Sequence, residues 1–221
     1  NLGDILNDQV AVEQDILSQV RPLKHLGSYL KNGYYPFFME VPSLYYSRLE
    51  EVINMTIEIE LPLLRKVEIS AIPKLKKLLQ IIAESVPFVP NISKLSERTG
   101  LNRNTVITYL GYLEEAHIIR NLYKDAKGIT RLQKPDKIYL ENTNLMYALS
   151  PGNVNTGNVR ETFFINQLGQ SHLVEYAEYG DFVVDRKYVF ETGGSGKNSR
   201  QLKNTREGFV VADDIEYGTA N

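Results

Sequence analysis

The sequence contains no cysteine, only three histidines and no long apolar run. Without cysteine, the 221-residue chain has no disulfide, no thiolate metal site and no cysteine nucleophile. His25, His117 and His172 lie far apart and lack the spacing of metal ligands, so we expect no zinc site. No apolar run approaches the roughly 18 residues of a membrane span, and we therefore expect no membrane contact.

The remaining composition is that of an ordinary globular protein, with 43% hydrophobic and 24% charged residues. A chain of this length suits about two or three small domains. It shows no secretory signal and begins at Asn1 rather than at a methionine. We therefore expect a cytoplasmic fragment of a longer protein, of unspecified oligomeric state.

Charge is distributed unevenly along a chain whose net charge is −2. Residues 1–62 carry a net charge of −5, residues 63–140 carry +7 and residues 141–221 carry −4. A basic middle segment in a nearly neutral chain indicates an anionic partner, such as DNA. The alternative is that these cations only solvate helices and loops; they include Lys74, Lys76, Lys77, Lys124, Lys127, Arg131, Lys134 and Lys137.

A helix-turn-helix pattern occupies residues 91–116 of this basic segment. Gly100 provides the tight turn, because glycine adopts a positive φ at little cost. Asn102 is a good N-cap for the helix that follows. The predicted buried face of that second helix has the i, i+4, i+7 spacing of one stripe: Val106, Leu110 and Leu113.

The outer side of the second helix carries the side chains that a recognition helix presents to a groove of DNA. Strand-like residues 118–123 and 138–140 predict the wing of a winged helix. The predicted DNA contacts are therefore Arg103, Asn104, Thr105 and Thr108 on the helix, with Lys124, Lys127 and Arg131 on the wing. A winged helix also serves as a protein-docking module, and a protein partner remains the alternative.

The other elements follow from periodicity and from turn residues. We predict helices over 2–20, 22–32, 43–60 (ended by Pro62), 73–86, 142–149, 160–170 and 199–207. We predict strands over 173–179, 181–184, 187–191 and 208–212, with a polar loop at 151–158 and a flexible turn at 193–196.

Five short motifs carry a resemblance to a known family: residues 29–36 (YLKNGYYP), 137–145 (KIYLENTNL), 180–182 (GDF), 188–191 (YVFE) and 211–216 (VADDIE). On these motifs and their order, the chain resembles the C-terminal part of a family of bacterial and archaeal AAA-type ATPases. It is most similar to the Bacteroidetes branch of that family.

The resemblance implies an α+β multidomain fold in three parts. Residues 1–62 correspond to a helical AAA-lid remnant, 63–140 to the winged helix-turn-helix, and 141–221 to a small α/β nuclease-like domain. The nucleotide-binding core of the family has no counterpart in this sequence. ATP and Mg²⁺ are therefore expected in the parent protein, which would be the ATPase, and no cofactor is expected in this chain.

The run Gly193–Ser199 superficially resembles a phosphate-binding loop. That motif requires a glycine where Glu191 stands and a serine or threonine where Asn198 stands. Without that hydroxyl the loop has no ligand for Mg²⁺, so we expect no ATP binding by the chain itself.

A second constellation concerns acidic residues at the ends of the predicted strands. In restriction-endonuclease-like nucleases an Asp and a Glu hold Mg²⁺, and a Lys two residues further on assists the attacking water. Asp181 and Glu191 fit the acidic positions, and Glu161 matches a third, which makes these three the candidate metal ligands. Gly193 stands at the lysine position, so Lys197 is the candidate substitute. We favour a degenerate, inactive domain, with no other lysine within reach.

Overall fold

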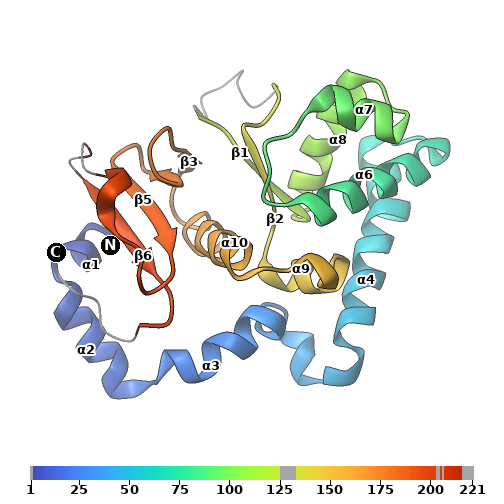
Figure 1. The fold of residues 1–221 in the computed structure, drawn as a ribbon. Helices are drawn as coiled ribbons and strands as arrows, with labels where there is room; N and C mark the ends of the chain where they lie inside the picture. Colours follow the sequence, from blue (N-terminus) through green and yellow to red (C-terminus); the bar gives the residue numbers. More distant parts are fainter. Residues whose placement is uncertain (1, 125–132, 203–204, 206, 216–221) are drawn as a thin grey trace.

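The computed structural model describes residues 2–124, 133–202, 205 and 207–215. The described residues form helices and two small sheets (Figure 1). The first part of the chain is helical: α1 (Leu2–Asn7), α2 (Gln9–Gln19), α3 (Pro22–Ser28), η1 (Tyr29–Gly33), η2 (Pro36–Met39), η3 (Pro42–Leu44), α4 (Tyr45–Met55), η4 (Thr56–Glu60), α5 (Leu61–Arg65), η5 (Ile69–Ala71) and α6 (Ile72–Ser85).

The second part contains both sheets. It comprises α7 (Ile92–Thr99), α8 (Arg103–Glu115), β1 (Ile119–Leu122), β2 (Lys137–Leu140), α9 (Thr143–Leu149), η7 (Pro151–Asn153), α10 (Thr156–Leu168), β3 (Val174–Tyr176), β4 (Phe182–Val184), β5 (Tyr188–Gly193), η8 (Ser199–Leu202) and β6 (Gly208–Ala212). β1 and β2 form an antiparallel pair. The other sheet has the order β3-β4-β5-β6, antiparallel except for the parallel β5–β6 pair.

The helix that begins at α4 does not end before Pro62, contrary to the prediction from the sequence. The turn η4 is a π-helix, in which the Leu61 N–H donates to the carbonyl oxygen of Thr56. Pro62 then falls in the first turn of α5, where a missing N–H is tolerated. The helix ends instead at Lys66, which adopts the left-handed conformation with φ 53°.

Three other segments differ from the predicted elements. The loop predicted at 151–158 is largely helical, because the Asn155 side chain accepts a hydrogen bond from the Asn158 N–H (2.9 Å) and starts α10 at Thr156. The helix predicted at 199–207 is limited to the short turn η8, and residues 203, 204 and 206 lie outside the described residues. The predicted flexible turn at 193–196 begins as strand, since Gly193 pairs with Ala212.

One large apolar core connects the long α4–α5 helix with α6, α7, α8, the β1–β2 pair and α9. Its buried members run from Leu49 to Val159. A second core lies between α10 and the four-stranded sheet, around Phe164, Phe182 and Phe190. The larger core crosses the predicted boundaries at residues 62 and 140, and the division into three folding units remains a prediction.

The N-terminal helices wrap around the outside of the molecule. Figure 1 shows α1 beside the four-stranded sheet and α3 leading towards α4 on the opposite side. The buried Asn144 of α9 bonds to the segment after α3: its Nδ2 donates to the Leu30 carbonyl (2.8 Å), and its Oδ1 accepts from the Tyr34 N–H (2.9 Å). Two of the five motifs noted in the sequence are thereby bonded to each other.

Candidate nucleic-acid interface

Helices α7 and α8 are each started by an asparagine side chain. Asn91 Oδ1 accepts from the Lys94 N–H (3.1 Å), and Asn102 Oδ1 accepts from the Thr105 N–H (2.8 Å). Gly100 ends α7 with φ 69°, so that the chain turns within the three residues before Arg103. This arrangement fixes the angle at which α8 leaves the turn.

Substitutions at two glycines test this account of the turn. Gly100→Ala should reduce the free energy of unfolding by about 1 kcal/mol, because an L side chain is strained at positive φ. Gly111 is the matched control. It lies within α8, and a Cβ there would meet no atom within 4 Å. Gly111→Ala should therefore stabilise the chain by about 0.5–1 kcal/mol. Urea denaturation measures both, and equal effects would contradict the proposed role of Gly100.

One side of α8 is buried and the other is open to solvent. Val106, Leu110 and Leu113 are at most 1% exposed and pack into the large core. Arg103, Asn104 and Thr108 are exposed, and we call these three residues the α8 face. Thr105, also predicted to face outward, is half-buried. Within the described residues Arg103 forms no ion pair, so its guanidinium is available to an anion.

The β1–β2 pair follows α8 at once, as expected for a wing. Ile119 pairs with Leu140 and Leu122 with Lys137. At the outer end of this pair, the Lys124 N–H donates to Asp136 (2.7 Å), and Lys124 Nζ lies 3.2 Å from Glu178 Oε2 in an exposed ion pair. The other two predicted wing contacts, Lys127 and Arg131, lie outside the described residues.

Some cations of the basic segment already have protein partners. Lys137 is not a solvated loop residue: it lies in β2, and its Nζ is 2.6 Å from Glu161 Oε2. Lys76 pairs with Glu58, and Lys74 Nζ donates to the Gly100 carbonyl (3.1 Å). Within the described residues, some of the basic segment's cations are therefore already paired, whereas Lys94, Arg98 and Arg103 on α7 and α8 form no ion pair.

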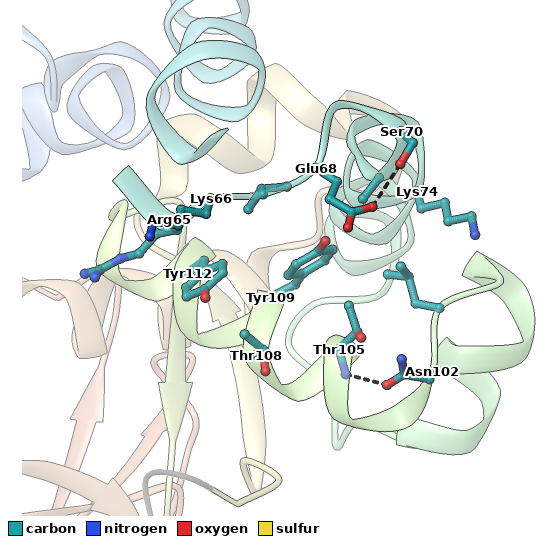
Figure 2. A pocket seen from close by; sticks show the side chains of 13 residues that line it. Arg65, Lys66, Glu68, Ser70, Lys74, Asn102, Thr105, Thr108, Tyr109 and Tyr112 are labelled. Carbon is teal, nitrogen blue, oxygen red and sulfur yellow. Dashed lines mark hydrogen bonds between the residues drawn. The ribbon is translucent and has the colours of Figure 1, made fainter. Parts of the chain in front are cut away.

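A groove of about 490 Å³ lies between α8 and the residues that connect α5 to α6 (Figure 2). We call it the tyrosine groove; its lining residues are Arg65, Lys66, Val67, Glu68, Ser70, Ala71, Lys74, Leu101, Asn102, Thr105, Thr108, Tyr109 and Tyr112. It shares Thr108 with the α8 face. Burial, and next the charge of Glu68, raises the pKa of Tyr109 above its ordinary value. Reasoning from the sequence missed this groove, because its two walls are more than thirty residues apart in the chain.

The three candidate metal ligands of the C-terminal part each have protein partners. Asp181 Oδ2 accepts from the Thr192 N–H (2.7 Å) and hydroxyl (2.8 Å). Glu161 Oε2 accepts from the Tyr139 hydroxyl (2.8 Å) as well as from Lys137. Among the residues that the structure describes, no group of three or more acidic or histidine side chains is arranged to hold a metal ion.

Glu191 is paired with Lys197, the lysine named as the candidate substitute. The Glu191 side chain is 4% exposed, and Lys197 returns across the glycine loop to contact it. A Cβ at Gly193 would lie 2.4 Å from the Lys197 Cβ and Cγ. The Lys197 side chain therefore occupies the space over Gly193 and reaches Glu191, as required of the candidate substitute.

Burial raises the pKa of the Tyr139 hydroxyl well above its ordinary value, and the neighbouring Glu161 and Asp181 carboxylates add to this shift. The hydroxyl therefore stays protonated and serves as a hydrogen-bond donor to Glu161. Lys137, Tyr139 and Glu161 together form a satisfied polar cluster between β2 and α10.

In the described part of the chain, no helix has the length and apolarity needed to cross a membrane. Comparison with known proteins gives no match to any curated protein or solved structure. Residues 23–156 match a family described as Domain of unknown function (DUF8612). The matched range covers the tyrosine groove, the α8 face and the β1–β2 pair, and extends over more than half of the sequence. The chain therefore belongs to the DUF8612 family.

Proposed function

We propose that the chain is the C-terminal, non-catalytic part of an AAA-type ATPase, and that α6, α7, α8 and the β1–β2 pair form a winged helix that binds duplex DNA. In this proposal ATP and Mg²⁺ bind to the nucleotide-binding core of the parent protein. The observation that carries the proposal is the α8 face, which is exposed beside a buried helical stripe.

The chemistry of the α8 face suits base readout in a major groove. An arginine bonds the O6 and N7 acceptors of guanine through two N–H groups, and an asparagine bonds adenine in the same way. Arg103 and Asn104 occupy the N-terminal turn of α8, the part of a recognition helix that contacts base edges. The Thr108 hydroxyl lies one turn further along α8 and is exposed.

The charge around α8 supports contact with phosphates. Lys94 and Arg98 on α7 are exposed, and no ion pair in the described residues involves them. Phosphate contacts supply most of the sequence-independent affinity for DNA. Such contacts would hold the duplex while the α8 face reads its bases.

Titration of a fluorescently labelled duplex with the chain tests this function. We expect saturable binding, measured by anisotropy, that weakens steeply as salt rises, because each neutralised phosphate releases counterions. Absence of binding at low salt would overturn the proposal and make docking to a protein partner the function of this module.

A second candidate function is Mg²⁺-dependent cleavage of nucleic acid by a nuclease-like C-terminal unit. One observation favours it, namely the Lys197 side chain over Gly193 and against Glu191. We rank cleavage second, because Asp181 and Glu161 already bond to protein groups. The C-terminal unit would then be an inactive relative of such nucleases.

Added Mg²⁺ distinguishes an active from an inactive C-terminal unit. We expect millimolar Mg²⁺ to leave the melting temperature unchanged, since only a ligand that binds the native state stabilises it. We also expect no cleavage of plasmid or single-stranded DNA. A rise in melting temperature with Mg²⁺ that Glu191→Gln abolishes, or cleavage with the same dependence, would contradict this prediction.

A further inference from the structure

The tyrosine groove lies directly beside the α8 face and differs from it in chemistry. One wall is α8, which contributes Thr105, Thr108, Tyr109 and Tyr112. The other wall is the connection from α5 to α6. Figure 2 shows Glu68 and Ser70 on this connection above Tyr109, with Lys66 and Lys74 at the two sides. The groove is thus lined by two tyrosine rings, hydroxyls, cations, one carboxylate and a few apolar side chains.

The charge of the groove favours an anion. Its lining includes Arg65, Lys66 and Lys74 against a single acidic residue, Glu68. Arg65 shares its charge with Glu115 in an ion pair of 2.7 Å whose side chains are about half exposed. Lys66 forms no ion pair within the described residues, so its ammonium group is free to bind an anionic ligand.

The aromatic wall favours a ligand with flat rings. Tyr112 is half-buried, and its ring centroid lies 6.0 Å from that of Tyr109 and 5.9 Å from the Arg65 guanidinium. Tyr112 therefore lines the groove beside a second aromatic ring and a cation. Rings that line a cationic groove are the usual stacking platforms for the bases of single strands.

We propose that the tyrosine groove binds unpaired nucleotides, with one base stacked on Tyr112 and the adjacent phosphate bound by Lys66. The proposal rests on the proposed function, since it places the unpaired strand beside a duplex held by the α8 face. An unpaired base is required because both faces of a base within a duplex are covered by its neighbours. The module would then prefer a duplex with a single-stranded overhang to a blunt duplex.

Backbone geometry provides a precise way to remove the Lys66 charge. Lys66 has φ 53°, a conformation that glycine adopts without strain. Lys66→Gly should therefore preserve the turn and leave the melting temperature unchanged or higher, while it removes the ammonium group. Lys24→Ala on α3, which removes an exposed lysine far from the groove in sequence, is the matched charge control.

The sequence has no tryptophan, so a single introduced indole reports on the groove alone. In Tyr112→Trp, saturating oligo(dT) should quench the tryptophan fluorescence through stacking. Tyr112→Ala should weaken oligo(dT) binding about tenfold, within the range found for one stacked base, and Tyr112→Phe should bind as the parent does. Lys66→Gly should also weaken binding, whereas Lys24→Ala should not.

The outcomes separate this inference from the proposed function. If Tyr112→Ala retains blunt-duplex binding but loses the preference for an overhang, both the duplex function and the inference about the groove are supported. If Tyr112→Trp is not quenched and no overhang preference exists, the inference is overturned, even where duplex binding persists. If Arg103→Glu does not affect blunt-duplex binding but oligo(dT) still quenches the indole, the inference stands and the duplex function fails.

Discussion

Arg120→Ala should cause a large loss of stability, because it breaks a largely buried ion pair. Arg120 lies on β1, and its guanidinium forms two bonds to Glu141, Nη2–Oε1 at 2.6 Å and Nε–Oε2 at 3.3 Å. The two side chains are only 18% and 4% exposed. Loss of one partner leaves a buried charge without its counterion, which costs about 3 kcal/mol or more.

Chemical denaturation of Arg120→Ala measures this cost directly. Arg48→Ala is the matched control, because Arg48 pairs with Glu40 at 3.2 Å but the two side chains are 38% and 70% exposed. An exposed pair contributes at most about 1 kcal/mol. The double variant Arg120→Met with Glu141→Leu should recover much of the loss, since it removes both buried charges. Equal effects of Arg120→Ala and Arg48→Ala would contradict the account.

Reversal of charge at Arg103 should produce the largest functional loss. Arg103→Glu removes a guanidinium from the α8 face and puts a carboxylate against the DNA. A lost base contact of roughly 1–3 kcal/mol combines with repulsion from the phosphates, so we expect duplex affinity to fall about 100-fold. The fold should be unaffected, because Arg103 is exposed and an acidic residue suits the first turn of a helix.

The control for this experiment must change the net charge by the same amount. Arg21→Glu does so at an exposed residue just before α3, in another part of the sequence. We expect Arg21→Glu to weaken duplex binding only slightly. Fluorescence anisotropy at one salt concentration measures the duplex affinity of both variants. Similar losses in the two variants would mean that net charge, rather than the α8 face, governs binding.

The sequence was sufficient to predict the elements whose signals are local. The Asn102 cap and the glycine at positive φ mark the turn between α7 and α8, and the apolar spacing of Val106, Leu110 and Leu113 indicates the buried side of α8. The positions of β1 and β2 in the sequence also follow from two short apolar runs, residues 118–123 and 138–140. Each of these features depends on residues within about one or two helical turns.

Features that depend on contacts between distant residues could not be predicted. The π-turn before Pro62 moves that proline into a tolerated position, and no local rule anticipates the shift in hydrogen bonding. The sequence indicates Lys197 as a candidate, but its contact with Glu191 depends on the glycine loop folding back over β5. The tyrosine groove exists only because the α5–α6 connection crosses α8, so its cations could not be assigned to a site from spacing alone.

The salt dependence of duplex binding by the parent chain and by Arg103→Ala tests the central claim most directly. The logarithm of the association constant should fall linearly with the logarithm of salt concentration, with a slope of about −0.9 for each phosphate neutralised. If Arg103 contacts the DNA, Arg103→Ala should bind more weakly at every salt concentration. If the contact is to a phosphate, the magnitude of the salt slope should also fall by about one. Equal affinity and equal slope in the two proteins would contradict DNA binding through the α8 face.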